Sequence, residues 1–254
     1  MIEYFNIPAG ALIHTPISKK LFAEKASLSA VEKRLLREEI EKLTMKGLLQ
    51  TRTVGLAAYI DDQQIYDQII FAQVSIKNRA KAIAVATMVQ RAFPAPMFLV
   101  IQCGESYCVN WCLKRINQTD KTMRVMEEQQ ITRFFIPQSD DRIANGWLLS
   151  LDITKILSNS LKELFEQLSA KLFLLKVADE AGCFTGLTIS EANLVYYRSL
   201  LEALNANIAE QQDIKKQLRE ESQFNRIVKL NGRLHELQEK EFRLKEQLKE
   251  KREK

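Results

Sequence analysis

Glycine and proline are scarce in this chain, and their scarcity restricts the fold. The 254 residues include 8 glycines and 5 prolines. Disordered chains and loop-rich all-β folds use more of both residue types. With 46% hydrophobic and 27% charged residues, the composition is otherwise that of an ordinary folded protein. The sequence therefore predicts a chain that is neither disordered nor a loop-rich all-β protein.

Motifs that bind phosphates or organise a catalytic nucleophile are missing as well. The chain contains neither GxxxxGK[ST] nor GxGxxG, which argues against ATP hydrolysis and dinucleotide binding. The two histidines, His14 and His235, have no companion motif, so nothing supports a nucleophile system built on serine, cysteine or histidine. We therefore expect no cofactor.

Cysteines are few, and their spacing is unlike that of metal ligands. Cys103, Cys108 and Cys112 are too widely spaced for the short pairs of a zinc site, and Cys183 lies far along the chain. Buried free thiols that pack as small hydrophobic groups are the favoured interpretation. We expect no metal site.

Long apolar runs are also lacking. None approaches the roughly 20 residues that a membrane-spanning helix needs, and residues 1–10 lack the basic start and apolar core of a signal peptide. A cytoplasmic, reducing compartment is the resulting expectation. The net charge of +5 is mildly basic, which permits acidic partners without predicting the strong basic patch of a dedicated nucleic-acid binder.

The first 137 residues have the pattern of an α/β layered domain within an α+β chain. Ser29 and Glu32 have the spacing of a capping box, which predicts a helix that runs through Ile40 and Leu43 and ends at Gly47. Further elements follow from periodicity and from the prolines after residue 93. They are strands over residues 49–54, 65–77, 97–102, 106–113 and 131–136, and a helix over residues 79–93.

The remaining residues read as a connector, a helical region and a long arm. Residues 138–186 begin with a polar stretch and then turn helical over 153–177. Thr188 and Glu191 have capping-box spacing and open a helical arm over residues 187–254. The second half of the arm has a heptad seam, with Glu241 in its one polar position. The seam residues are Ile227, Leu230, Leu234, Leu237, Leu244 and Leu248.

A weaker seam precedes this one in a different phase, with its apolar residues at Leu201, Leu204, Ile208 and Leu218. The phase changes at residues 222–225, which allows either one helix with a stutter or an antiparallel hairpin. Because no glycine or proline lies between Gly186 and Gly232, the sequence favours one continuous helix of about 90 Å. Such a helix needs a partner helix from the same chain, a second copy or another protein.

Asp67 and Lys77 are the candidate catalytic residues. The order of helix, strands, helix and buried strand is that of the PD-(D/E)XK nuclease core, in which carboxylates hold a divalent metal and a lysine assists the attacking water. Asp67 lies near the start of the strand over 65–77 and Lys77 ends it. However, Ser75 stands where the core needs a metal-binding carboxylate, and serine is a poor Mg²⁺ ligand. A degenerate nuclease-like fold is therefore expected, with an active metal-dependent nuclease as the alternative.

Nucleic-acid binding is a second alternative. Tyr107 and Trp111 share one face of a predicted strand, and stacking aromatics with nearby cations can hold single-stranded nucleic acid. A solvated group of cations beside core aromatics is the competing interpretation. The candidate cations are Lys114, Arg115, Lys121 and Arg124.

Three segments resemble the bacterial family called domain of unknown function 4391. Residues 79–100 are similar to that family's helix, its Phe-Pro-x-Pro break and its buried strand, and residues 112–115 are similar to its strand ending in Lys-Arg. The most specific match is Gln223-Phe224-Asn225 with Leu230-Asn231, within the C-terminal helix. Gly232 departs from the family pattern, which has an apolar residue there.

The resemblance implies a function without a known activity. Members of the family sit beside helicases and DNA methyltransferases in bacterial defence or restriction-like clusters. The leading hypothesis is therefore a non-enzymatic accessory or scaffold subunit of such a complex. It would bind a helicase or DNA methyltransferase subunit, or a second copy of itself, through the C-terminal seam. Phe224, Asn225 and Asn231 would contact the partner or fix the register, as polar residues do in coiled coils.

Overall fold

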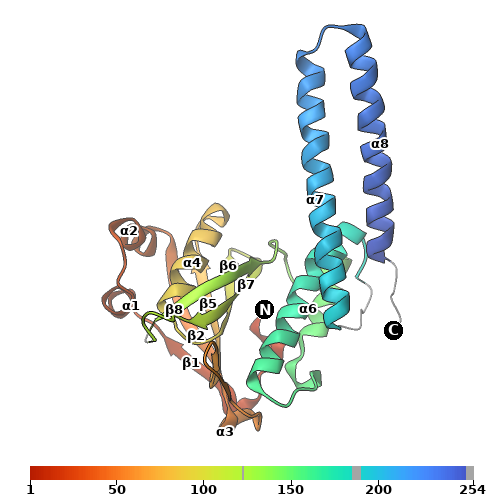
Figure 1. Cartoon of the computed structure of the whole chain (residues 1–254). Helices are drawn as coiled ribbons and strands as arrows, with labels where there is room; N and C mark the ends of the chain where they lie inside the picture. Colours follow the sequence, from red (N-terminus) through yellow and green to blue (C-terminus); the bar gives the residue numbers. More distant parts are fainter. Residues whose placement is uncertain (122, 185–189, 250–254) are drawn as a thin grey trace. The chain divides into compact units, whose positions relative to one another are not determined.

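A computed structural model describes residues 1–121, 123–184 and 190–249 (Figure 1). The chain divides into two compact units, Met1–Phe173 and Leu174–Lys254. The first unit is built on a β-sheet with helices and the second is helical, so the chain is α+β. The start of the arm predicted at Thr188 lies outside the described residues.

The first unit contains a mixed six-stranded sheet in the order β1-β2-β5-β6-β7-β8. Neighbouring strands are antiparallel except β5 and β6, which are parallel and are connected through helix α4. A separate ribbon joins β3 (Tyr59–Ile60) to β4 (Ile65–Tyr66). The strands of the main sheet are β1 (Leu12–Pro16), β2 (Ile40–Gln50), β5 (Gln68–Ile76), β6 (Met97–Cys103), β7 (Ser106–Ile116) and β8 (Arg124–Ile131).

Short helices and 3-10 turns connect these strands. The predicted capping box is confirmed, because the Ser29 N–H donates to the Glu32 carboxylate and the Glu32 N–H donates to Ser29 Oγ. The helices are α1 (Lys19–Lys25), α2 (Ala30–Glu38), α3 (Thr51–Val54), α4 (Ala82–Ala92), α5 (Arg142–Leu148) and α6 (Leu161–Ala181). The 3-10 turns are η1 (Ile2–Phe5), η2 (Ala9–Ala11), η3 (Arg79–Lys81), η4 (Leu149–Leu151) and η5 (Ile153–Lys155).

The predicted helix from Ser29 to Gly47 was wrong in its second half. Helix α2 ends at Glu38, and Ile40, Leu43 and Gly47 belong to strand β2. The pairing of β2 with β5 shifts register twice, and each such irregularity changes which side chains face the core. The apolar spacing of a twice-irregular strand then resembles that of a helix. Gly47 lies within β2 and does not end a helix. A Cβ at this position would lie 2.8 Å from Ile7 Cδ1, so the glycine makes room for the Ile7 side chain.

Two other predicted strands are displaced. Only the first two residues of the strand predicted over residues 49–54 lie in β2, because Thr51–Val54 form helix α3. The strand predicted over residues 131–136 is also wrong, since β8 already ends at Ile131. Beyond it, Phe135 forms an isolated bridge with Tyr107, and Thr132 Oγ1 accepts from the Val109 N–H.

Each face of the sheet has its own core. On one face Ile70, Val74 and Ile76 of β5 join an aliphatic cluster that includes residues of α2 and α4. On the other face Phe71 and Phe98 pack with Phe5 and with Phe165 of α6, with ring centroids between 4.6 and 6.5 Å apart. The alternation of β5 and β6 thus sends aliphatic side chains to one core and aromatic rings to the other.

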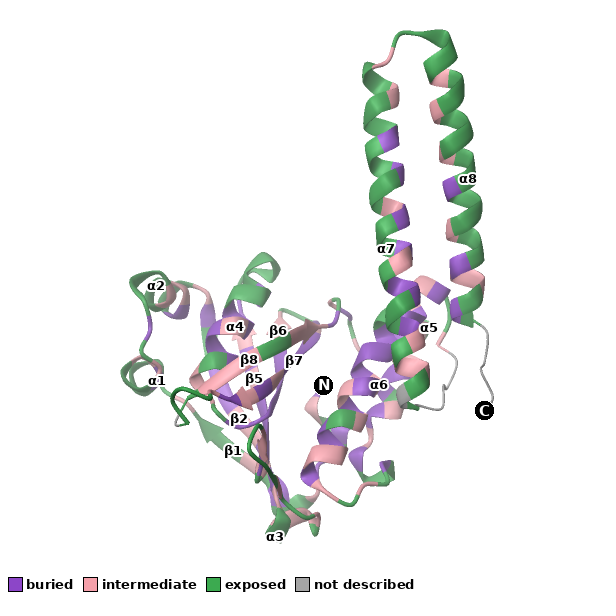
Figure 2. Ribbon diagram, in the orientation of Figure 1, coloured by how far each residue is buried: buried purple, intermediate pink, exposed green. Residues whose placement is uncertain are grey.

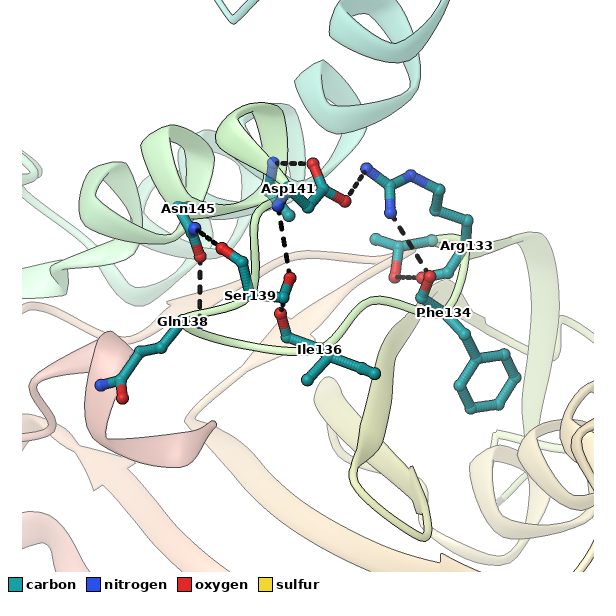
Figure 3. A network of polar contacts seen from close by, with 9 residues as sticks. Arg133, Phe134, Ile136, Gln138, Ser139, Asp141 and Asn145 are labelled. Carbon is teal, nitrogen blue, oxygen red and sulfur yellow. Dashed lines mark hydrogen bonds and ion pairs between the residues drawn. The ribbon is translucent and has the colours of Figure 1, made fainter.

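The polar segment after the sheet is held by hydrogen bonds (Figure 3). Asn145 accepts from the Gln138 N–H and donates to the carbonyl of Ser139, and Gln138 has a left-handed φ of 60°. The Asp141 carboxylate accepts from the Ala144 N–H at the start of α5 and pairs with Arg133 at 2.7 Å. The backbone of this segment is therefore fixed from several directions.

The second unit contains two long helices packed side by side (Figure 1). Helix α7 (Glu191–Glu220) and helix α8 (Phe224–Lys249) are joined by three residues, so they form an antiparallel hairpin. The prediction of one continuous helix was wrong. The turn needs no glycine or proline, because the Glu221 carboxylate accepts from the backbone N–H groups of Ser222 and Gln223. These bonds also hold the pKa of Glu221 below its usual range.

Candidate functional site: the surface of the C-terminal hairpin

The leucine seam of α8 faces α7 within the hairpin (Figure 2). Leu237, Leu244 and Leu248 are buried, whereas Ile227, Leu230 and Leu234 toward the turn are half-buried. Of the three sources considered for a partner helix, the same chain supplies one. The facing residues of α7 recur at heptad spacing: Tyr197, Leu200, Leu204, Asn207, Gln211, Ile214 and Leu218. The weaker seam predicted for α7 shares Leu204 and Leu218 with these residues, whereas its Leu201 and Ile208 each follow one of them by one position. Two of the facing positions are polar, which hid the true phase of the seam.

Those two polar residues belong to a layer that crosses the hairpin. Gln211 donates from Nε2 to Asn207 Oδ1 at 2.8 Å and to Glu241 Oε2 at 2.7 Å. Glu241 also pairs with Lys245 at 2.7 Å. The hydrogen bonds from Lys245 and Gln211 hold the pKa of Glu241 below its usual range. A buried polar layer of this kind matches one position on α7 to one on α8 and so fixes their register.

An ion pair fixes which flanks of the two helices lie together. Arg233 Nη2 lies 2.9 Å from Glu210 Oε1. Arg233 immediately precedes the seam residue Leu234, and Glu210 immediately precedes the seam residue Gln211. We call the positions just before the seam residues the preceding flank of each helix, and the positions just after them the following flank. The preceding flanks of α7 and α8 therefore lie next to each other on one side of the hairpin. The following flanks of the two helices lie next to each other on the opposite side.

Three of the predicted interaction residues are exposed. Phe224 is 76% exposed at the start of α8, and Asn225 and Asn231 are exposed too. Asn231 donates to the carbonyl of Ile227 one turn earlier, so it does not join the core of the hairpin. Two further apolar side chains that sequence reasoning missed, Val228 and Phe242, are 53% and 66% exposed. Each follows a seam residue by one position, which is the signal that could have revealed them.

Asp67 and Lys77 do not meet in the structure. Asp67 immediately precedes β5 and Lys77 immediately follows it, and both side chains are exposed. The nine residues of β5 separate them, so they are ten residue steps apart along an extended strand, or about 33 Å at 3.3 Å per residue. They cannot act on one scissile bond in this arrangement. Within the described residues, no three histidine, cysteine or acidic side chains are grouped so as to hold a metal ion.

The four basic residues near β7 have different roles. Lys114 is only 7% exposed, and its ammonium donates to the carbonyls of Phe93 and Ala95, where α4 ends. Burial lowers the pKa of Lys114 to about 7. Arg115 pairs with Glu127 at 2.9 Å. A phosphate could therefore reach Lys114 only after the end of α4 had moved.

Lys121, Arg124 and Trp111, the other residues of the predicted nucleic-acid surface, do not form one binding surface either. Arg124 donates to the backbone carbonyls of Lys121 and Met123, and the Lys121 side chain is exposed. Trp111 is 5% exposed, so its ring is not a platform on which a base can stack. The structure does not bring these residues together as a stacking surface.

The thiols in the sheet are buried and hard to ionise. Burial raises the pKa of Cys108 to about 12 and that of Cys112 to about 11. A thiolate is the reactive form of cysteine, so neither side chain is prepared for nucleophilic chemistry. Cys103 is half-buried and Cys183 is exposed, and both are free.

An open cleft of about 480 Å³ lies beside the segment drawn in Figure 3. Its walls come from η1, from the turn between β6 and β7, and from residues 136–138. The polar side chains along it include the carboxylates of Glu3 and Glu105, the amide of Gln102 and the phenol of Tyr107. Gln102 already accepts from Gln73 and donates to the carbonyl of Gly104. These groups do not form a nucleophile with a base.

The comparisons with known proteins give a family and no activity. The sequence model of the family described as "Domain of unknown function (DUF4391)" matches residues 5–240. The chain belongs to this family. The matched residues include both the sheet unit and most of the hairpin. No curated protein and no solved structure matches the chain. Within the described residues of this DUF4391 protein, no helix is long and apolar enough to cross a membrane.

Proposed function

We propose that this DUF4391 protein is a non-enzymatic accessory subunit that binds a protein partner through the outer surface of α8. The partner is a helicase or DNA methyltransferase subunit of a bacterial defence or restriction-type complex. The inner seam of α8 is occupied by α7, so the binding residues are the exposed ones, led by Phe224, Val228 and Phe242.

The exposure of these three side chains is the observation that carries the proposal. Large aromatic residues supply much of the binding energy of protein interfaces, and the cost of leaving them in water is recovered when a partner covers them. Phe224 and Phe242 lie on the helix that carries the most family-specific motif. In the sheet unit, the predicted catalytic and nucleic-acid sites are not assembled, because Lys114 is buried and Asp67 is far from Lys77.

The test uses the full chain, co-expressed with any helicase and any DNA methyltransferase found to be encoded beside it. Size-exclusion chromatography with light scattering is expected to show a stable complex with one of them. The double substitution Phe224→Asp and Phe242→Asp is expected to weaken the complex by at least about tenfold, since it places two carboxylates where apolar contact is lost.

Leu157→Asp is the matched control, because Leu157 is 90% exposed and belongs to the sheet unit. It should leave the complex unchanged. The proposal is wrong if neither neighbouring protein binds, or if the α8 double variant and Leu157→Asp behave alike.

A further inference from the structure

Helix α8 carries a second stripe at heptad spacing, beside the seam that faces α7. Five of its six members follow a seam residue by one position. The six are Phe224, Val228, Asn231, His235, Gln238 and Phe242, and all are exposed. None is acidic and none is lysine or arginine, although the positions around them are rich in charge. The stripe extends over 18 residue steps, or about 27 Å at 1.5 Å per residue.

The adjoining flank of α7 has a related character. The pair Arg233–Glu210 places the preceding flanks together on one side, so the following flanks lie together on the other. On α7 the following flank contains the half-buried Ile208, the exposed Gln212, and two exposed cations, Lys215 and Arg219. The two flanks together form what we call the following face of the hairpin. It carries apolar side chains at Phe224, Val228, Phe242 and Ile208, polar ones at Asn231, His235 and Gln238, and two cations at its α7 edge.

Carboxylates are sorted away from this face. Along residues 205–219 and 224–242, none of the positions that follow a seam residue is acidic. The carboxylates of these stretches lie in the seam, on the preceding flanks or on the outer surfaces: Glu210, Asp213, Glu236, Glu239 and Glu241. Lys215 is close enough for its charge to help lower the pKa of Glu241. The positions that follow a seam residue thus carry cations and no carboxylate, with Glu241 of the seam near Lys215 and Glu239 3.8 Å from His235.

Near the C-terminal end of α8, a lysine on the following flank already lies beside carboxylates. Lys245 follows the seam residue Leu244 and donates to Glu241. Its pKa is raised first by that hydrogen bond and further by the charge of Glu180 near the end of α6. Within the second unit, then, a carboxylate from a third helix already lies near this flank.

From this arrangement we infer that the following face docks an amphipathic helix whose apolar stripe is bordered by carboxylates. The inference rests on the proposed function and names the chemistry of its partner. A helix of about 18 to 20 residues would match the stripe in length and would complete a three-helix bundle. Its leucine-type side chains cover Phe224, Val228 and Phe242, and its carboxylates pair with Lys215 and Arg219.

A second copy of the chain does not fit this face. A two-fold dimer places the same patch of both copies together. Because the following positions of this face include no acidic residue, the second copy would bring further cations and no carboxylate toward Lys215 and Arg219, which opposes association. An acidic helix from another protein has the complementary charge.

The test uses the full-length protein and two labelled peptides of about three heptads each. Both have leucine at the seam positions, and one has glutamate where the other has lysine at the flanking positions. Fluorescence anisotropy at about 0.1 M salt is expected to show binding of the glutamate peptide only, because charge pairs at the edge are still felt at this screening length.

Neighbouring lysines provide the matched variants. Lys215 lies on the following face, whereas Lys216 is exposed and points away from both seams. Lys215→Glu is expected to weaken binding of the glutamate peptide about tenfold, and Lys216→Glu less than about twofold, although the change in net charge is the same. Circular dichroism of both variants should match that of the parent, since both side chains lie on the surface.

Several results would overturn the inference. They are equal binding of the two peptides, equal effects of the two lysine variants, displacement of the glutamate peptide by duplex DNA, or a dimer that Lys215→Glu dissociates. If the glutamate peptide does not bind while the helicase or methyltransferase complex still depends on Phe224 and Phe242, only the partner chemistry is wrong. If neither holds, the proposed function is wrong as well.

Discussion

The two units of the molecule use buried polar groups in different ways. In the sheet unit, Gln90 donates to the carbonyl of Met97 and to Asn110, and Lys114 holds the end of α4. These bonds join α4 and the segment that follows it to strands β6 and β7. In the hairpin, Asn207, Gln211 and Glu241 form one layer between two consecutive helices. In the sheet unit, buried polar side chains thus hold different elements together. In the hairpin, the buried polar side chains lie in the seam between α7 and α8, and the following face stays exposed.

The largest effect that separates the two units should be the pH dependence contributed by Lys114. Burial lowers its pKa to about 7 in the folded chain, against about 10.4 when unfolded. Between these values the unfolded chain binds a proton that the folded chain does not, so stability rises with pH. We expect Lys114 to contribute a slope of up to about 1.4 kcal/mol per pH unit, so that the stability measured by urea unfolding rises from pH 7 to about pH 8.

Lys114→Met removes the titrating group and should flatten this slope. Above about pH 8.5 the trend should reverse, because unfolded thiols ionise there while Cys108 and Cys112 stay protonated in the folded chain. The account of Lys114 would be contradicted by the same slope in Lys114→Met and in the parent protein.

A smaller effect is expected from the polar layer of the hairpin. Gln211→Leu removes one of the two partners of Glu241 and should cost about 1 to 2 kcal/mol. Changing Glu241 to leucine as well should restore the stability, since apolar side chains can replace a buried polar layer at little cost. Hydrogen exchange of α7 and α8 measures both steps. A double variant no more stable than Gln211→Leu alone would show that the layer does not act as a unit.

The smallest effect should come from Glu32, which ties α2 to α4. Its hydrogen bond with Arg91 lowers its pKa to about 2. A carboxylate with a depressed pKa contributes stability that is present above its unfolded pKa and is lost as pH falls toward 2. Glu32→Gln should therefore cost about 1 kcal/mol at pH 7 and nothing further on acidification. Urea midpoints at pH 7 and pH 3 compare the two proteins, with Glu24→Gln as the control for losing an exposed carboxylate.

The sequence predicted elements where the local pattern and the tertiary structure agree. The capping box at Ser29 and the alternation of β7 are examples, and the heptad seam from Ile227 to Leu248 is another. The prediction was wrong at β2, where register shifts give a strand helical spacing, and at the turn of the hairpin, where Glu221 replaces the expected glycine.

The candidate site was predicted only in part, for a related reason. Phe224, Asn225 and Asn231 were identified, but Val228 and Phe242 were hidden by the stronger seam one position away. The α7 seam was predicted only in part, through Leu204 and Leu218, because Asn207 and Gln211 occupy two of its positions. Their pairing with Glu241 is a tertiary match between separate helices, which no single helical pattern reveals.

Hydrogen–deuterium exchange of the full chain, free and bound to the proposed helicase or methyltransferase partner, tests the central claim most directly. Our account predicts slower exchange on binding in residues 224–242 of α8 and in residues 205–219 of α7, with no change along β7 and β8. Protection confined to residues 1–173, with the hairpin unchanged, would contradict it.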